Sequence, residues 1–161
     1  MSNFLKNRKS TRDFKKKRLD NIIKTEVLEI FKDLEEEVNN EYFNFILFEE
    51  GDKIYKSLDG LAGYAGVMIE SPYYIGIRLK EVTEKAIITA SYYTEKLMTL
   101  LANENLGTCW VNVKDVDKNI KADILGEDNK NIGYLVALGY PKAKNPFVQE
   151  ATSSRYGVSD I

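Results

Sequence analysis

The residues best suited to chemistry in this sequence stand in one short stretch near its start, residues 8–14. Arg8 and Arg12 flank Ser10, so two guanidinium groups and a hydroxyl fall within a few residues of one another. Guanidinium groups bind phosphate oxygens in a bidentate manner, and a hydroxyl both donates and accepts hydrogen bonds. The stretch therefore suits a ligand that carries a phosphate and a polyol. Ordinary surface arginines and a serine in a turn would have the same spacing.

Two later stretches also contain reactive or ligand-binding residue types. One is Leu106-Gly107-Thr108-Cys109-Trp110-Val111, and the other is Ala137-Leu138-Gly139-Tyr140-Pro141-Lys142, which precedes a polar tail containing Arg155. Cys109 and Trp110 are predicted to be packing residues, because free cysteine is commonly buried and nothing nearby in sequence activates its thiolate. The chain has no histidine. Ser-His and Cys-His catalysis and histidine-based zinc sites are therefore excluded, and no metal site is predicted.

Three glycines in Gly60-Leu61-Ala62-Gly63-Tyr64-Ala65-Gly66 are reminiscent of a phosphate-binding loop. The stretch lacks the Gly-Lys-Ser/Thr ending and the Gly-x-Gly-x-x-Gly order of such loops. A permissive loop near a ligand or a helix junction is the better interpretation.

Charge is distributed unevenly along the chain. The first 18 residues hold eight basic side chains against Asp13 alone, so the remainder carries a net charge of −9 within a total of −2. A basic end of this kind binds an anion such as a phosphate, or is a solvated surface or a nucleic-acid arm.

Hydrophobic periodicity predicts alternating helices and strands. A short helix is expected from Ser2 to about Lys9, and an extended surface segment from Ser10 to Arg18. The further predicted helices are 19–38, 52–58, 83–106 and 115–125, and the predicted strands are 41–49, 72–79, 108–113 and 131–140.

The helix from Thr83 onward is apolar on more than one face. Such a helix is expected to be buried, either centrally in a domain or between two subunits. Gly107 suits the left-handed position that ends it, so that the chain can leave as a strand.

Length and composition predict one soluble globular domain spanning residues 1–161. Apolar residues make up 43% of the chain, which is enough for a core. No stretch is long and apolar enough to span a membrane, and the N-terminus has no signal-peptide run. With a single cysteine, this predicts a cytoplasmic protein. The element order allows either a parallel α/β sheet or an α+β arrangement.

Taken together and in order, the three stretches resemble the nitroreductase family of FMN-dependent flavoproteins. Arg8, Ser10, Arg12 and Phe14 fit its Arg-x-Ser-x-Arg-x-Phe/Tyr motif. Residues 106–110 fit the Leu-Gly-Thr-Cys-Trp that follows its long central helix, and residues 138–141 fit the Leu-Gly-Tyr-Pro that ends its last core strand. The resemblance spans nearly the whole chain.

This resemblance implies an α+β sandwich in which helices flank a central mixed β-sheet, and one long central helix is buried. It implies a homodimer with FMN in the interface, which transfers hydride from NADH or NADPH to nitroaromatics, quinones or similar small acceptors in alternating half-reactions. The flavin itself carries the redox chemistry, so no catalytic side chain is assigned.

The resemblance also implies which residues bind the cofactor. Arg8 would pair with the flavin phosphate, Ser10 would bond the phosphate or ribityl chain, and Lys9 would contact the same chain. Arg12 would lie near the flavin N1/O2 edge, where a cation stabilises the negative charge of the reduced flavin. Arg155 would reach the phosphate.

Two further candidate residues would lie next to the flavin N5 edge. Family members often have glycines after the Cys-Trp strand, with backbone N–H groups facing N5. This sequence has Asn112 and Val113 there, and they are the corresponding candidates.

Two alternative functions are compatible with the same residues. One is a non-catalytic dimer that binds or stores flavin. The other, placed last, is a basic-arm protein that binds nucleic acid. We prefer the oxidoreductase to both, because it gives Arg8, Ser10 and Arg12 a joint purpose.

Overall fold

The structure is a computed structural model that describes residues 9–143. Its centre is a four-stranded sheet with the order β1-β2-β4-β3. The strands are β1 (Phe43–Phe48), β2 (Tyr73–Leu79), β3 (Gly107–Asn112) and β4 (Tyr134–Gly139), and each neighbouring pair is antiparallel. An isolated parallel bridge joins Ser10 to Thr108. The predicted α+β class is thus confirmed, with parallel pairing in the described residues confined to this bridge.

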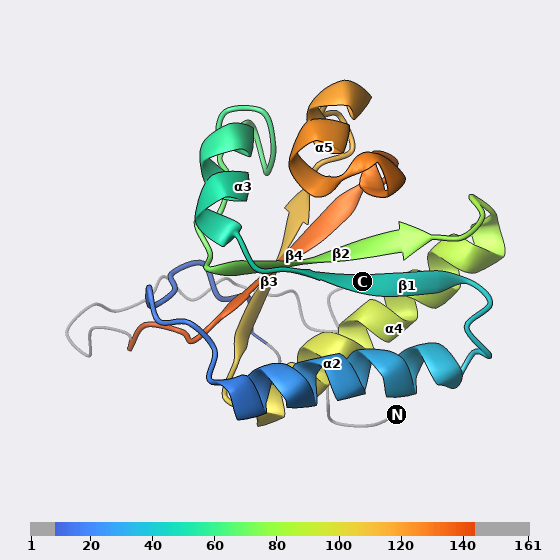
Figure 1. Ribbon diagram of the computed structural model, residues 1–161, viewed down its shortest axis with the longest axis horizontal. Helices are drawn as coiled ribbons and strands as arrows, with labels where there is room; N and C mark the ends of the chain where they lie inside the picture. The colour runs from blue at the N-terminus through green and yellow to red at the C-terminus, as the bar shows by residue number, and fades with distance from the viewer. Residues whose placement is uncertain (1–8, 144–161) are drawn as a thin grey trace, which may run out of the picture.

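Helices cover both faces of the sheet (Figure 1). Helices α2 (Asn21–Glu36) and α4 (Glu84–Asn103) lie on one face, and α3 (Gly51–Leu58) and α5 (Lys118–Leu125) lie on the other. A short 3-10 helix, Glu127–Asn129, follows α5. The predicted helices and strands within residues 9–143 are present, with ends shifted by a few residues, and the expected helix from Ser2 lies mostly outside the described residues.

Each strand supplies apolar side chains to two cores, because successive side chains point to opposite faces. On β4, Val136 and Leu138 pack in the core under α2 and α4, whereas Leu135 and Ala137 pack in the core under α3 and α5. The buried run of β4 therefore reflects a sheet enclosed between two helical layers.

Helix α4 begins at a capped residue and ends differently from the sequence prediction. The Thr83 hydroxyl accepts a hydrogen bond from the Ala86 N–H at 3.2 Å. At the other end, Asn105 occupies the left-handed region with φ 59°. Gly107, predicted to fill that position, instead opens β3, and this prediction was wrong because asparagine also adopts the left-handed conformation readily.

Helix α4 is covered by this chain on one side only. Leu97, Met98 and Leu101 are fully buried against the sheet, but Ile88 and Tyr92 are 61% and 57% exposed. The expected burial on more than one face is therefore not achieved within a single chain.

The extended segment 9–18, called the strap, lies along the edge of β3 and across the end of β4. The Thr11 N–H donates to the Thr108 carbonyl at 2.9 Å, and the Lys15 N–H donates to the Tyr140 carbonyl at 2.8 Å. Phe14 anchors the strap in the core at 5% exposure. The prediction of an extended segment is confirmed, and the strap is attached to the sheet at both of these points.

Two glycines allow the strap to approach the sheet this closely. A Cβ added at Gly107 would lie 2.6–2.8 Å from atoms of the Thr11 side chain. A Cβ at Gly139 would lie 3.1 Å from the Phe14 ring and 2.8 Å from Pro72. Both glycines of the Leu-Gly motifs are thus contact points for the strap.

We predict that Gly107→Ala destabilises the protein by roughly 1–3 kcal/mol, because Thr11 is β-branched and cannot turn away without moving the strap. The free energy of unfolding from urea titration measures this. Gly133→Ala is the matched control, since a Cβ there meets nothing within 4 Å. Combining Gly107→Ala with Thr11→Gly should recover part of the loss. Equal effects of the two alanine substitutions would contradict this account.

A second prediction concerns the ion pair that joins α2 to α4. The Lys96 Nζ lies 2.7 Å from a Glu37 carboxylate oxygen, and its hydrogen bond holds the pKa of Glu37 below the ordinary value of 4.5. A carboxyl whose pKa is lowered by folding stabilises the protein above its unfolded pKa, and the stabilisation disappears as the pH falls through the lowered value.

Glu37→Gln should therefore lower the free energy of unfolding at pH 7 by at most about 1 kcal/mol, because both side chains are partly exposed. The difference from the wild type should vanish below the lowered pKa of Glu37. Lys32 and Glu36, 3.7 Å apart on α2 and more exposed, supply the control Glu36→Gln, for which a smaller effect is expected. A difference for Glu37→Gln that persists in acid would refute the assignment.

Candidate functional site

The strap holds Arg12 at the junction of two cavities. Ser10 pairs with Thr108 on β3, and the buried ring of Phe14 anchors the strap two residues after Arg12. The Arg12 side chain is exposed and lines both cavities. Of the predicted cofactor-binding residues that the structure describes, Arg12 is the one found in a cavity wall.

The first cavity, called the β3 cavity, has a volume of about 420 Å³. Its wall combines Arg12 and Ile69 with part of the loop 63–67 and residues 109–111 of β3. Apart from the guanidinium of Arg12, the side chains are apolar or aromatic. A planar ring with a polar edge is the kind of ligand that such a lining accommodates.

Cys109 and Trp110 contribute surface to the β3 cavity while being held by their neighbours. Cys109 is buried at 5% exposure. The Trp110 Nε1 donates to a Glu95 carboxylate oxygen at 2.7 Å, and its ring meets that of Tyr134 edge to face. Trp110 is thereby held in place as a wall of the cavity.

The glycine loop, residues 60–66, contributes Gly63, Tyr64 and Ala65 to the wall of the β3 cavity. Its ends meet where the Gly60 N–H donates to the Gly66 carbonyl, and the Gly63 N–H donates to the Asn112 carbonyl at 2.7 Å. Gly63 has φ +82°, and a Cβ there would lie 2.0 Å from the Val67 carbonyl oxygen. The glycines thus close a tight loop beside a cavity, in agreement with the interpretation that favoured a permissive loop.

Asn112 and Val113, the predicted N5 candidates, lie just past the β3 cavity. The Val113 side chain is buried at 1% exposure, and its N–H donates to the Gly133 carbonyl at 2.9 Å. Asn112 accepts the Lys114 N–H through its side chain at 2.9 Å. The amide of Val113 is therefore already engaged within the chain.

The remaining predicted residues are separated from the cavities or lie outside the described range. Lys9 and Ser10 are exposed at the start of the strap. Arg8 and Arg155 lie outside the described residues.

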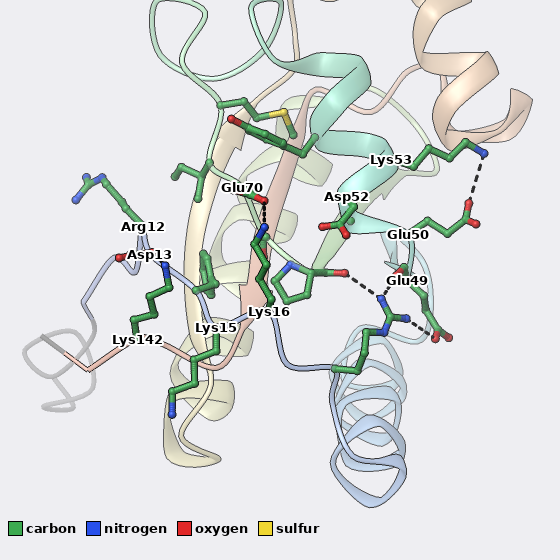
Figure 2. A pocket seen from close by; sticks show the side chains of 18 of the residues that line it. Arg12, Asp13, Lys15, Lys16, Glu49, Glu50, Asp52, Lys53, Glu70 and Lys142 are labelled. Carbon is green, nitrogen blue, oxygen red and sulfur yellow. Dashed lines mark hydrogen bonds and ion pairs between the residues drawn. The ribbon is translucent and has the colours of Figure 1, made fainter.

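The second cavity, called the α3 cavity, has a volume of about 660 Å³ and lies between the strap and the start of α3 (Figure 2). Strap residues between Arg12 and Arg18, residues 49–53, Tyr55, residues 67–72 and Lys142 line it. Arg12, Val67 and Ile69 belong to both linings, so the two cavities adjoin.

Ion pairs neutralise most charges around the α3 cavity. Lys142 lies 2.8 Å from Asp13 and Lys16 lies 3.5 Å from Glu70, while Glu50 pairs with Lys53 and Glu49 with Arg18 and Lys24. The hydrogen bond to Asp13 raises the pKa of Lys142. Asp59 is the main cause of a raised pKa at Tyr55, with burial and Glu70 acting in the same direction.

Three charged residues of the α3 cavity stand outside these pairs. Within residues 9–143, no hydrogen bond or ion pair is formed by the side chains of Arg12, Lys15 or Asp52. Nothing in the sequence distinguishes Asp52, because a carboxylate in the first turn of a helix is common.

A buried lysine holds the ends of β3 and β4 together behind the site. The Lys121 Nζ donates to the Ile132 carbonyl at 2.9 Å and to the Val113 carbonyl at 3.3 Å. Burial lowers the pKa of Lys121, since the charged form loses hydration, and Lys118 adds to this effect. Lys121 therefore fixes the backbone that follows β3.

Residues 9–143 contain no group of three or more Cys, Asp or Glu side chains arranged to hold a metal ion. No helix in the same range is long and apolar enough to cross a membrane.

The family model described as "Putative TM nitroreductase" matches residues 1–158. Solved structures with the same fold include an FMN-dependent nitroreductase from Clostridium difficile R20291. It has 20% identity and a TM-score of 0.69, and the match covers 100% of this chain and 94% of that chain. A comparison with functionally curated proteins gave no significant match.

Two further solved structures are similar. A nitroreductase with bound FMN from Bacteroides fragilis NCTC 9343 has 15% identity and a TM-score of 0.68, covering 96% of this chain and 97% of that chain. A nitroreductase family protein from Clostridium novyi NT has 23% identity and a TM-score of 0.62, and the match covers 86% of this chain and 83% of that chain. At these identities the structures establish the shared fold.

Proposed function

The chain belongs to this nitroreductase family, and we propose that it is an FMN-dependent oxidoreductase. It would transfer hydride from NADH or NADPH to nitroaromatic, quinone or similar small acceptors. The observation that carries the proposal is the β3 cavity, an apolar slot with the Arg12 guanidinium in its wall, placed beside the strap.

The described residues fit FMN chemically. An isoalloxazine ring is planar and has an apolar face, which suits the apolar lining of the β3 cavity. Its N1/O2 edge is polar and becomes negative on reduction, which suits the Arg12 guanidinium, unpaired within residues 9–143. Ser10 and Lys9 precede Arg12 on the strap and would contact the ribityl chain, and Arg8 and Arg155 would bind the phosphate.

When bound, FMN supplies the hydride-accepting and hydride-donating centre. The residues of this chain would bind and orient the flavin. Arg12 would place a positive charge near the N1/O2 edge, where negative charge develops on reduction, and this favours the reduced state. Trp110 and Val111 would form an apolar wall beside the ring. Asn112 and Val113 would lie near the N5 edge, although the Val113 N–H is already bonded to the Gly133 carbonyl.

We also propose a homodimer with FMN in the interface. Obligate interfaces resemble a domain core cut in half. Ile88 and Tyr92 on α4 and Val82 just before it are exposed at 61%, 57% and 81% in the single chain, and these apolar side chains would be covered by a partner. The single cysteine supports a cytoplasmic location.

The strap's ion pairs argue against the nucleic-acid alternative. Lys16, Lys17 and Arg18 pair with Glu70, Asp20 and Glu49 of the same chain. A basic arm for nucleic acid instead needs cations that are available to neutralise phosphates.

A visible absorption spectrum tests the proposal. The purified protein, or the protein mixed with FMN, should show bound-flavin bands, and NADH or NADPH should bleach them under anaerobic conditions. A protein that binds FMN but resists bleaching would be a flavin-storage protein. Failure to bind FMN would remove the proposed function altogether.

A sharper prediction concerns the cations assigned to FMN. Arg8→Ala and Arg12→Ala should each weaken FMN binding by roughly 1.5–3 kcal/mol, the cost of losing a charge-assisted hydrogen bond. Equilibrium titration by flavin fluorescence measures this. Arg78→Ala is the control, because Arg78 lies near the far end of β2 and lines neither cavity. An unchanged affinity in the Arg8 or Arg12 variant would show that its assignment is misplaced.

A further inference from the structure

The α3 cavity adjoins the β3 cavity, so it is a candidate site for the part of the hydride donor that lies beyond the nicotinamide ring. A nicotinamide ring that reaches a flavin in the β3 cavity is joined through a pyrophosphate to an adenosine half of comparable size. This half must lie beyond the β3 cavity. The α3 cavity is continuous with it through Arg12, Val67 and Ile69, and its volume of about 660 Å³ lies within the range of small-molecule sites.

We propose that the α3 cavity binds the adenosine diphosphate half of NADH, with the Asp52 carboxylate accepting hydrogen bonds from the adenosine ribose. This inference rests on the proposed function, because it takes NADH as the hydride donor. It adds a subsite and a preference between NADH and NADPH.

Among the described residues, Asp52 is the carboxylate of the α3 cavity that no cation pairs. The other acidic side chains in the lining, Asp13, Glu49, Glu50 and Glu70, are each paired with a cation of this chain. Asp52 forms no such pair with the described residues, and Figure 2 shows its carboxylate directed into the space between α3 and the strap. An ionised carboxylate only accepts hydrogen bonds, so it selects a ligand with donors. A ribose diol supplies two.

The opposite side of the cavity supplies cations for phosphates. Lys15 on the strap lines the cavity and forms no hydrogen bond or ion pair within residues 9–143. Its ammonium is therefore available to a phosphate when Arg12 is engaged by the flavin. Positive charge on the strap and a carboxylate on α3 match the polarity of a nucleotide.

The floor between these charges is apolar. Phe14 and Met68 are each 5% exposed, and Ile69, Tyr55 and Pro72 complete it. A purine base is planar and largely apolar on its faces, so it can cover such a floor without leaving buried polar groups unpaired.

The position of Asp52 predicts a preference for NADH. NADPH replaces one ribose hydroxyl, a donor, with a phosphate that only accepts and carries negative charge. Opposite an unpaired carboxylate, that phosphate is repelled and forms no hydrogen bond. Carboxylates that bind the adenosine ribose discriminate against NADPH in this way.

The experiment measures 5′-ADP binding directly, by calorimetry on the FMN-loaded protein, alongside kcat/KM for NADH, NADPH and reduced nicotinamide mononucleotide. Asp52→Asn should weaken 5′-ADP binding about tenfold, the equivalent of one charge-assisted hydrogen bond. It should also lower the preference for NADH over NADPH. Lys15→Gln should weaken 5′-ADP binding as well, and raised salt should do so in the wild type.

Glu50→Gln is the matched control. It removes the same charge only two residues before Asp52, but the Glu50 carboxylate is already paired with Lys53 at 3.4 Å. It should leave 5′-ADP binding within twofold of the wild type. Thermal unfolding of each variant checks that the fold is intact.

The inference is overturned if 5′-ADP does not bind, if Asp52→Asn and Glu50→Gln act equally, or if NADH is no better a donor than its mononucleotide. These outcomes differ from failure of the proposed function. Protein that takes up no FMN would refute that function, whereas calorimetric titration of 5′-ADP into the flavin-free protein would still report on the α3 cavity.

Discussion

The close approach of the strap to the sheet is the constraint on which the site depends. Backbone hydrogen bonds to Thr108 and Tyr140 hold the strap, but such bonds form only if nothing stands between the two segments. Gly107 and Gly139 remove the side chains that would collide with Thr11 and Phe14. Arg12 lies between these two contacts, so its position follows from two glycines far away in sequence.

The enclosure of the sheet determines where a ligand can bind. Helices pack on both faces of the sheet, and the cavities form where the strap, the glycine loop and the start of α3 meet. The glycine loop is tied to the end of β3 through Gly63 and Asn112. The wall of the β3 cavity is therefore built on the strand itself.

Ion pairing determines which charged side chains of the site remain available to a ligand. The basic N-terminal run appears as a block of charge in the sequence, yet in the fold Lys16, Lys17 and Arg18 each meet a carboxylate. What remains unpaired among the described residues of the α3 cavity is Arg12 and Lys15 on the strap and Asp52 on α3. The available charges are therefore fewer than composition suggests, and they lie on opposite sides of the α3 cavity.

The sequence by itself determined the elements, because hydrophobic period is a local property. The three-four spacing of α2 and the apolar run of β4 were sufficient to locate them, and the three motifs in order indicated the family. Residue patterns were less informative where a position serves a distant contact. Gly107 has the features of a helix terminator, but only its closeness to Thr11 in space explains the glycine.

Tertiary structure alone decided which side chains share a cavity and which charges remain available. Arg12, the glycine loop and β3 are separated by long stretches of chain and meet only when the strap docks. Asp52 cannot be distinguished in sequence from Glu50, since both are acidic residues at the start of a helix. The difference is that Glu50 meets Lys53 while Asp52 faces the cavity, and side-chain packing in three dimensions decides this.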